Sequence, residues 1–311
     1  MQYYTNPDIQ TFKHNVVATT GFFDGIHRGH QKVIREVVKS AAEKQMLSAV
    51  ITFWPHPRIV LNKDVSQFKL LSTLDEKRYL IENLGVDDLI VVPFTYELSQ
   101  LSAEDFFKLI LIEKLKVKSL IVGYDHHFGK GGQANFGKIK EIGEHAGVCV
   151  ERIEANSING VTISSSKIRE ALQNGDIIAA NEYLGYNYPL SGTVVHGKKL
   201  GRKMGFPTAN IQPDDVLKLI PQDGIYAVKV IHNNITYNGM LSIGIRPTID
   251  DERQRTIEVN IFDFDKTIYG DTISLQFIAR LRNELKFDSI NELRLQIEQD
   301  KIDSITVLNA L

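Results

Sequence analysis

The first 185 residues alternate short apolar runs with segments in which apolar side chains recur every three or four positions. The apolar runs predict strands, and the segments between them predict helices. The predicted strands are residues 16–20, 48–53, 89–92, 119–122 and 148–153. Two of the helices begin with capping-box sequences, Thr73-Leu74-Asp75-Glu76 and Ser102-Ala103-Glu104-Asp105. This alternation predicts a parallel, doubly wound α/β sheet of the Rossmann-like kind, which binds ligands at the carboxyl ends of its strands.

The pattern changes after residue 185, where strand-like segments follow one another without helices between them. These segments are residues 190–195, 225–231, 235–243, 256–262 and 272–278. Asn233-Asn234 suits a tight hairpin turn, and consecutive strands of this kind indicate a small antiparallel β-barrel. A final helix is predicted after the capping sequence Ser289-Ile290-Asn291-Glu292. We therefore predict two domains, residues 1–185 and 186–311.

Composition restricts the possible partners. The 311 residues are long enough for two hydrophobic cores, and 43% of them are hydrophobic and 24% charged, as in ordinary globular proteins. The net charge of −2 provides no overall field that attracts nucleic acid or an anionic membrane. The first residues do not resemble a signal peptide, no apolar run approaches the ~18 residues of a membrane span, and Cys149 is the single cysteine. We expect a cytoplasmic enzyme, a monomer or weak oligomer, that binds small molecules.

Residues 21–30 (Gly-Phe-Phe-Asp-Gly-Ile-His-Arg-Gly-His) join the first predicted strand to a helix. Their glycines let the backbone approach a ligand, and the first amides of the helix carry partial positive charge. His27 and His30, three residues apart, fall on one face of the first turn, where two imidazoles can bind the phosphates of a nucleotide. The residues predicted to bind the nucleotide here are Gly21, Phe23, Asp24 and Gly29. The alternative is a tight turn with two surface histidines.

Two further segments are expected at the same edge of the sheet. Asp125 follows the strand at 119–122 and can bind a ribose hydroxyl, the adenine amino group or a flavin, although a loop aspartate that caps a turn is an equal alternative. In the sequence Ile163-Ser-Ser-Ser-Lys-Ile-Arg169, the hydroxyls of Ser164 and Ser165 open a helix and a cation follows, which suits departing phosphates. The alternative for this segment is an ordinary helix cap.

Closely spaced glycines and basic residues occupy positions 192–210 of the second domain. The spacing is not that of a Walker A loop, but the amides of such a segment can still form a nest around a triphosphate. The residues predicted to bind nucleotide are Gly197, Gly201, Arg202, Gly205, Pro207 and Thr208. Thr208 and Asn210 offer two neutral oxygens for a Mg²⁺ ion that keeps its waters and bridges phosphates. The alternative is a basic surface hairpin.

Residues 256–261 form an alternating strand that carries Glu258 on its polar face, together with Thr256 and Asn260. A carboxylate fixed on a strand can accept the proton of an alcohol that attacks a γ-phosphate. Exposed strand glutamates are nevertheless much more common than catalytic bases.

The three motifs of the first domain resemble, in order and approximate spacing, those of the bacterial FAD synthetases, a branch of the nucleotidyltransferase superfamily. The resemblance implies adenylyl transfer to FMN, with His27, His30 and Arg169 as catalytic residues and Asp125 at the nucleotide or flavin. Two features depart from the family pattern. His126 stands where Phe is usual, and residues 130–135 lack the arginine that often follows Phe-Gly.

The second domain resembles riboflavin kinases in Phe206-Pro-Thr-Ala-Asn210, in residues 224–228, 243–248 and 282–287, in Tyr269-Gly270 and in the Glu258 strand. This resemblance implies that Thr208 and Asn210 bind Mg-ATP and that Glu258 is the base. It also implies that Arg246, Arg282 and Glu284 belong to the flavin site. Asn260 replaces the His that is usual two residues after this Glu.

Together the two resemblances cover nearly the whole chain and indicate the prokaryotic bifunctional riboflavin kinase/FAD synthetase family. The implied substrates are riboflavin, FMN and ATP with Mg²⁺, and the implied products are FMN and FAD. Two alternatives remain at this point: an enzyme that has kept riboflavin kinase but lost adenylylation, and a non-catalytic flavin-binding or regulatory protein.

Overall fold

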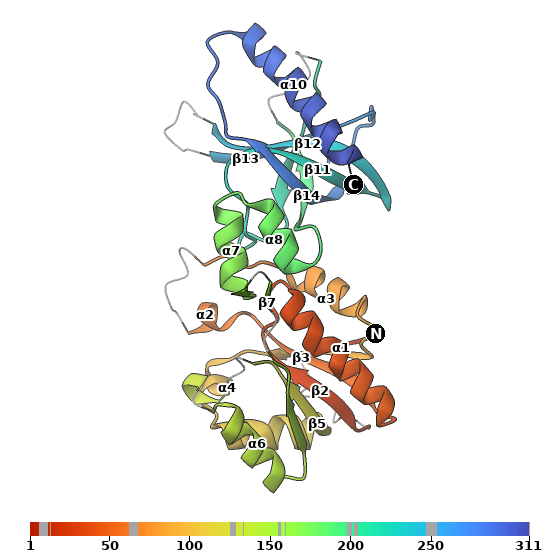
Figure 1. Ribbon diagram of the computed structural model, residues 1–311, viewed down its shortest axis with the longest axis vertical. Helices are drawn as coiled ribbons and strands as arrows, with labels where there is room; N and C mark the ends of the chain where they lie inside the picture. Colours follow the sequence, from red (N-terminus) through yellow and green to blue (C-terminus); the bar gives the residue numbers. More distant parts are fainter. Residues whose placement is uncertain are drawn as a thin grey trace. The chain divides into compact units, whose positions relative to one another are not determined.

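A six-stranded parallel sheet organises the first part of the chain (Figure 1). Its order is β1 (Gln2–Thr5), β4 (Asp88–Pro93), β3 (Leu47–Trp54), β2 (Val16–Thr20), β5 (Val117–Val122) and β6 (Cys149–Arg152). All neighbouring strands of the sheet are parallel, which confirms the predicted doubly wound α/β class. Pattern reasoning missed β1, because a short edge strand with polar ends lacks an apolar run.

The computed structural model describes residues 1–5, 12, 14–61, 68–124, 129–132, 134–154, 157–158, 160–197, 201, 205–246 and 254–310. Packing divides the chain into two units, Met1–Ser165 and Ser166–Leu311. Two helices that precede the barrel, α7 (Ser165–Gln173) and α8 (Ile177–Leu184), fall almost wholly in the second unit. A functional boundary at residue 185 stays a prediction.

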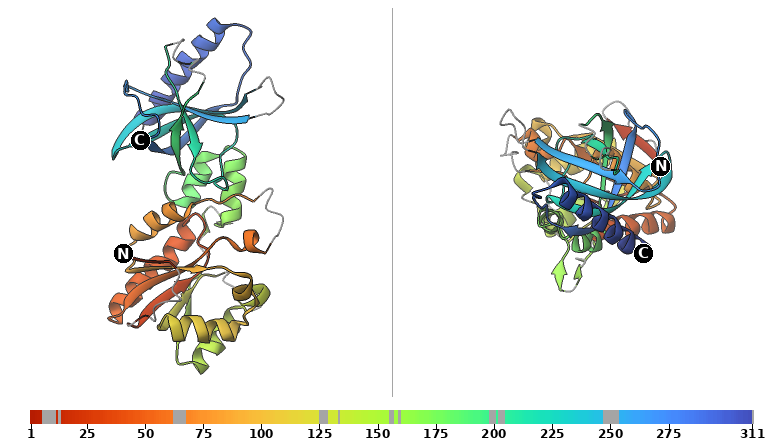
Figure 2. Two further views of the ribbon diagram at one scale, coloured as in Figure 1. Left: turned by 180° about the vertical axis from the view of Figure 1, so that it is seen from behind. Right: turned by 90° about the horizontal axis from the view of Figure 1, so that it is seen from above.

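Side chains of β2 alternate between the two faces of the sheet. Val17 packs with Val33 and Val37 of α1 (Arg28–Glu43), whereas Val16 and Ala18 join the core on the other face. That other core is covered by the π-helix η2 (Phe106–Lys114) and by α6 (Phe136–His145). Figure 2 shows the sheet between these helices from behind. The strands are therefore buried on both faces, which explains their nearly continuous apolar runs.

Both predicted helix caps are present. Thr73 caps α3 (Leu74–Glu82) with a complete capping box to Glu76, and Ser102 accepts a hydrogen bond from the Asp105 amide. Ser102 opens the short helix α5 (Ala103–Asp105), which continues directly into η2. The remaining short elements of this unit are α2 (Pro57–Val60), α4 (Tyr96–Gln100), the 3₁₀ turn η3 (Lys130–Gly132) and the antiparallel pair β7 (Ser157–Ile158) and β8 (Val161–Thr162).

The second unit is built on a closed antiparallel barrel, as predicted. Its order is β10 (Ala209–Pro213), β13 (Gln254–Ile261), β12 (Ile235–Arg246), β11 (Gly224–His232), β14 (Thr272–Arg282) and β9 (Pro189–Val195). Asn233 and Asn234 join β11 to β12 with φ of 49° and 62°, the left-handed conformation that a tight hairpin requires. The sequence pattern does not predict β10, whose first two residues belong to the glycine-rich segment 192–210.

The terminal helix α10 (Ile290–Asn309) begins after the predicted cap at Ser289. Its residue Leu308 belongs to a core cluster with Ala227 of β11, Met240 of β12 and Ile278 of β14. The view from above in Figure 2 shows α10 lying against the barrel. This helix therefore covers one side of the barrel.

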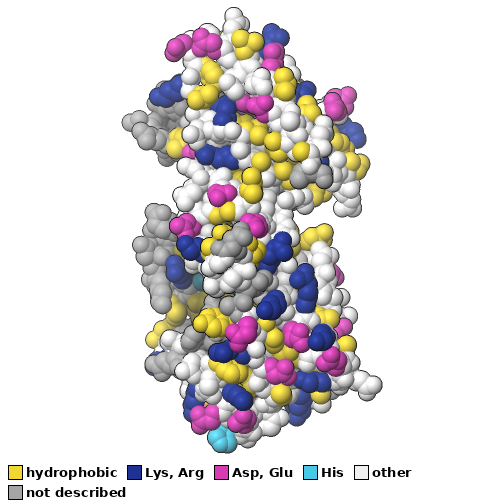
Figure 3. Space-filling view, in the orientation of Figure 1, with side chains coloured by type: hydrophobic (Ala, Val, Ile, Leu, Met, Phe, Trp, Pro, Cys, Tyr) yellow, Lys and Arg dark blue, Asp and Glu magenta, His cyan; other side chains and the backbone are white. Residues whose placement is uncertain are grey.

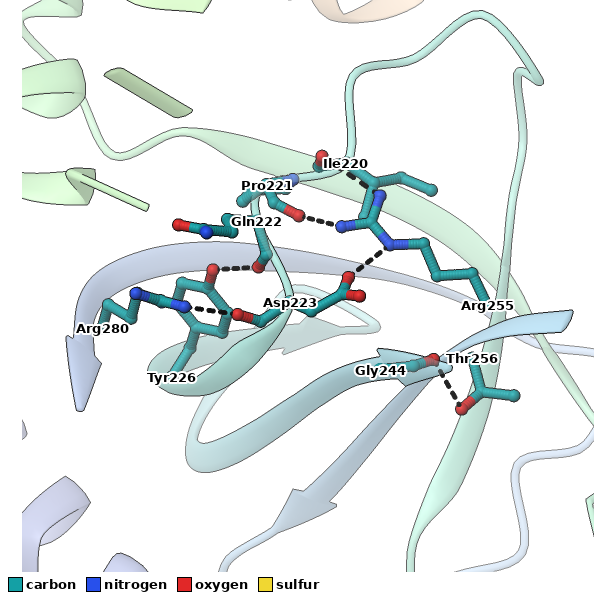
Figure 4. A network of polar contacts seen from close by, with 9 residues as sticks. All are labelled: Ile220, Pro221, Gln222, Asp223, Tyr226, Gly244, Arg255, Thr256 and Arg280. Atoms are coloured by element: carbon teal, nitrogen blue, oxygen red, sulfur yellow. Dashed lines mark hydrogen bonds and ion pairs between the residues drawn. The ribbon is translucent and has the colours of Figure 1, made fainter. Parts of the chain in front are cut away.

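Two arginines fix the segment that enters β11. Figure 4 shows Arg255 and Arg280 reaching this segment from opposite sides. Arg255 pairs with the Asp223 carboxylate at 2.6 Å and donates to the Pro221 carbonyl, while Arg280 donates to the carbonyl of Asp223. Tyr226 adds a hydrogen bond from its hydroxyl to the Gln222 carbonyl. These cations thus satisfy backbone carbonyls beside the barrel.

Acidic and basic side chains are interspersed over the face of the molecule that Figure 3 shows. This mixture agrees with the net charge of −2. In the part of the chain that the structure describes, no helix has both the length and the apolar character needed to cross a bilayer.

Candidate active sites

The turn between β2 and α1 has an unusual backbone. Phe23, Gly25 and Ile26 have φ of 47°, 81° and 35°, which non-glycine residues rarely adopt. Space is also tight at Gly21 and Gly29, because a Cβ would lie 3.2 Å from the Phe23 ring at the first position and 3.1 Å from the His27 ring at the second. The turn therefore brings main chain and aromatic rings together at the carboxyl end of β2.

His27 and His30 lie side by side at the start of α1. Their rings are stacked with centroids 3.6 Å apart, and the Phe23 ring meets His30 edge-on. His27 is the N-cap of the helix, and its Nδ1 accepts the amide of His30 at 3.3 Å. This bond assigns the proton of the neutral His27 ring to Nε2. The structure thus brings both predicted histidines to the amino end of a helix, where anions bind.

Asp24 is 6% exposed and contacts the main chain. Its carboxylate accepts the amides of Leu71 at 3.0 Å and Ser72 at 3.1 Å, and the Gly25 amide donates to the Ser72 hydroxyl. These bonds tie the turn to the segment before α3. A structural role for Asp24 is therefore evident, and nucleotide binding by Asp24 stays a prediction.

Sequence reasoning missed Lys77, which is 3% exposed on α3. Its ammonium donates to the Phe22 carbonyl at 2.6 Å and to the Thr52 hydroxyl at 3.4 Å. Burial lowers the pKa of Lys77 to about 8, an effect that Asp24 opposes. Burial, and then the charges of His27 and Lys77, hold the pKa of His30 well below its usual 6.5. A lysine in a capped helix resembles any solvated residue in sequence, so no local signal identifies it.

The third predicted motif reaches the same turn. Ser165 begins α7, as expected, and its hydroxyl donates to the main-chain oxygen of Asp24 at 2.9 Å. Ser164 directly precedes this helix, and Arg169 lies on α7 within the second unit. Asp125 and His126 lie outside the described residues. The predicted roles of Asp125, Ser164, Ser165 and Arg169 in binding or catalysis stay predictions.

The barrel contains a cavity of about 780 Å³. Predicted site residues from three parts of the unit line it: Gly201, Thr208, Glu258, Arg282 and Glu284. Thr256 and Asn260 share this lining with Glu258, whereas Ile257, Val259 and Ile261 are buried, so the predicted alternation of this strand is confirmed. The size of the cavity is typical of small-molecule sites.

Glu258 and Thr208 are hydrogen-bonded inside this cavity. The Thr208 hydroxyl donates to Oε2 of Glu258 at 3.1 Å, and the pairing of β10 with β13 places Asn210 directly opposite Glu258. Because the hydroxyl proton points at the carboxylate, the lone pairs of Thr208 Oγ1 remain available to a cation. Within the described residues no cluster of three or more His, Cys, Asp or Glu could hold a metal. The oxygen set fits Mg²⁺ that takes its other ligands from phosphates and water.

Lack of space for a side chain explains two of the glycines beside this pair. A Cβ at Gly197 would overlap the side-chain amide of Asn210, and one at Gly201 would overlap the Phe206 carbonyl. Gly205 has a φ of 86°. Arg202 lies outside the described residues.

Asn260, which departs from the family pattern, has a defined contact. Its side-chain amide donates to the Pro207 carbonyl at 2.6 Å. This bond ties β13 to the residue that precedes Thr208. Asn260 therefore helps to hold the Thr208 segment in place.

Two of the predicted flavin residues, Arg282 and Glu284, line the cavity. Arg282 makes two hydrogen bonds, of 2.7 and 2.6 Å, to the carboxylate of Asp300 on α10. The Glu284 carboxylate lies over Gly244, where a Cβ would overlap it. Burial, and then the Asp223 charge, raise the pKa of Glu284. The side chain of Arg246 lies outside the described residues, and flavin contact by any of the three stays a prediction.

The fold and the two sites define a class of protein: a Rossmann-like α/β unit with a glycine-rich turn and two histidines at a helix start, joined to a small barrel with a carboxylate and hydroxyl cavity. Residues 9–167 match the family model described as FAD synthetase, and residues 184–308 match the one described as riboflavin kinase. The chain belongs to the bifunctional riboflavin kinase/FMN adenylyltransferase family, which confirms the resemblance read from its motifs.

Relatives with that name match most of the chain. The Listeria monocytogenes protein is 40% identical over 295 residues, covering 93% of this chain and 91% of its own length. The Escherichia coli protein is 34% identical over 287 residues, covering 92% and 90%. A solved structure from Streptococcus pneumoniae, described as a macrolide-efflux protein, is 31% identical with a TM-score of 0.89, covering 97% of this chain and 98% of its own.

The Arg282–Asp300 pair should contribute strongly to the stability of the barrel. We expect Asp300→Ala to lower the free energy of unfolding by about 3–5 kcal/mol, because it leaves a mostly buried guanidinium unpaired. The double variant Arg282→Met/Asp300→Leu should lose less, since it removes both charges. Denaturant unfolding of the barrel measures both effects. Equal stability of Asp300→Ala and the native protein would contradict this role.

Proposed function

We propose that this protein makes FAD from riboflavin in two ATP-dependent steps. The barrel phosphorylates riboflavin to FMN, and the α/β unit transfers an adenylyl group to FMN and releases pyrophosphate. The observation that carries the proposal is the presence, in one chain, of the Glu258–Thr208 pair in a cavity and the stacked His27 and His30 at a helix start. The family names of the matching models and relatives support the same pair of activities.

In the first step, Glu258 accepts the proton of the riboflavin 5′-hydroxyl as that oxygen bonds to the γ-phosphorus of ATP. The bond to the β-phosphate oxygen breaks, and ADP leaves. The hydrogen bond from Thr208 orients the carboxylate, and the glycine-rich segment that includes Gly197 and Gly201 binds the phosphates through its amides. Thr208 and Asn210 would hold Mg²⁺, which supplies charge neutralisation on the phosphates when bound.

In the second step, an FMN phosphate oxygen attacks the α-phosphorus of ATP and pyrophosphate leaves. The chain provides hydrogen-bond donors at the start of α1, where charge develops on the phosphate oxygens. His27 can donate from Nε2 because its Nδ1 is occupied by the helix cap. Arg169 supplies a positive charge to the departing pyrophosphate. No covalent enzyme intermediate is required.

The setting of the enzyme is also part of the proposal. We infer a cytoplasmic monomer or weak oligomer that acts on small molecules and binds neither nucleic acid nor membranes. The net charge of −2 and the single free thiol of Cys149 support this inference.

A direct assay tests both activities. Purified protein incubated with riboflavin and Mg-ATP should yield FMN and then FAD, which chromatography separates. FMN without FAD would identify a kinase that has lost adenylylation. Unchanged riboflavin would identify a flavin-binding protein and overturn the proposal.

Replacing His30 should affect one step. We expect His30→Ala to reduce FAD formation from supplied FMN by about 100- to 1000-fold, because it removes a donor at the developing charge. FMN formation from riboflavin should be unchanged. His145→Ala, an exposed histidine at the end of α6, is the matched control and should leave both steps intact. Loss of FMN formation in His30→Ala would contradict the two-site assignment.

Replacing Glu258 should produce the converse result. Glu258→Gln keeps the size of the side chain and an acceptor for Thr208 but cannot take the proton, so FMN formation should fall about 100- to 10,000-fold. Supplied FMN should still be adenylylated at the native rate. Glu298→Gln on the exposed face of α10 is the control. Native kinase activity in Glu258→Gln would exclude this residue as the base.

A further inference from the structure

Lys77 places a positive charge inside the α/β unit, next to the turn between β2 and α1. The side chain comes from α3, and the residues Ile81 of α3 and Ile34 of α1 share one core cluster, so the two helices lie on the same face of the sheet (Figure 1). Within the described residues, the hydrogen-bond acceptors of its ammonium are the Phe22 carbonyl and the Thr52 hydroxyl, and both are neutral. The ammonium also lies 6.0 Å from the centre of the Trp54 ring. Burying a cation with neutral acceptors is unfavourable unless something else compensates it.

The acceptors of the Lys77 ammonium connect it to the turn that precedes His27 and His30. Phe22 lies between Gly21 and the positive-φ residue Phe23, so the bond from Lys77 fixes the first peptide units of the turn. The Thr52 hydroxyl also donates to the Phe22 carbonyl, at 3.3 Å, and so joins the same contact to β3. Phe23 in turn packs edge-on against His30. One buried ammonium therefore supports the backbone that carries the stacked histidines.

We propose that Lys77 is a positioning residue of the adenylyl-transfer site, whose buried ammonium holds the Phe22–Phe23 backbone and sets the electrostatic environment of the His30 ring. The proposal rests on the proposed function, because it assigns Lys77 to the FMN adenylylation step. A bound triphosphate would supply the negative charge that compensates the buried ammonium.

The charged groups around Lys77 come from different elements. Asp24 in the turn favours the ammonium. Burial, and then the charges of His27 and Lys77, hold the pKa of His30 on α1 well below 6.5, so His30 is neutral at pH 7. A neutral imidazole keeps one N–H donor and one acceptor nitrogen. Nδ1 of His30 is buried and lacks a hydrogen-bond partner among the described residues, which is uncommon for a buried polar atom.

Because the pKa of Lys77 is about 8, the role of its ammonium can be tested through the pH dependence of adenylyl transfer. As pH rises through this value the free enzyme loses the ammonium, so kcat/KM for adenylyl transfer should fall with an apparent pKa near 8. A lysine that only packs in the core would not produce this pH dependence. Lys77→Arg keeps its charge to higher pH, and Lys77→Met removes the charge while keeping an unbranched chain.

The experiment measures kcat/KM for FAD formation from supplied FMN between pH 5.5 and 9.5, with the riboflavin kinase step assayed in parallel. We expect Lys77→Met to lower kcat/KM roughly 10- to 100-fold at pH 7.5. The same variant should abolish the limb of the pH profile near pH 8, which is the fall in kcat/KM as the ammonium loses its proton. Lys77→Arg should move that limb upward, and the kinase step should be unchanged in every variant. Lys39→Met, an exposed lysine on α1, is the matched control. A native pH profile in Lys77→Met would overturn the proposal.

A second measurement needs no turnover. Titration of the His30 ring by NMR should give a pKa well below 6.5 in the native protein, and Lys77→Met should move it upward because a nearby positive charge is gone. An unchanged His30 titration would overturn the electrostatic part of the proposal. If Lys77→Met does not fold, retention of the limb near pH 8 in Lys77→Arg would overturn it instead. Absence of FAD formation in the native protein would refute the proposed function, whereas the NMR titration still decides the coupling of Lys77 to His30.

Discussion

The α/β site depends on one anchored carboxylate. Asp24 accepts the amides of Leu71 and Ser72, and these bonds hold a turn in which Phe23, Gly25 and Ile26 have positive φ. Such backbone is unfavourable by itself and persists when the surroundings fix it. Because the turn is fixed, α1 starts at a defined point, with His27 at its N-cap and the His30 ring stacked on the His27 ring. Asp24 thus acts on the shape of the site through the chain it binds.

In the barrel, closure of the sheet fixes the positions of the site residues. Antiparallel pairing sets Asn210 opposite Glu258 and brings Thr208 within hydrogen-bonding distance of that carboxylate. A closed sheet leaves little freedom for register to slip, so the distance between these oxygens follows from the strand pairing. Asn260 adds a bond to the residue before Thr208. The departure from the usual His is therefore compatible with an intact segment at the cavity.

The positive side chains described above bind different kinds of partner. Arg255 and Arg280 bind carbonyls of the segment before β11, and Arg282 binds Asp300. Lys77 donates a hydrogen bond to the Phe22 carbonyl in the turn between β2 and α1. A basic residue close to a motif in sequence is therefore weak evidence for ligand contact, since buried main-chain oxygens compete for the same donors.

The sequence alone determined the α/β class, the barrel, the capped helices α3 and α10, and the family. These features depend on local periodicity, capping chemistry and motif order, which neighbouring residues encode directly. The edge strand β1, the strand β10, the anchoring of Asp24, the Asn260 contact and the burial of Lys77 were decided by tertiary structure. Each depends on groups distant in the chain: Lys77 lies 55 residues from Phe22, and Asn260 lies 53 from Pro207. A local pattern records the character of a side chain, but burial and partners arise only when the elements pack together.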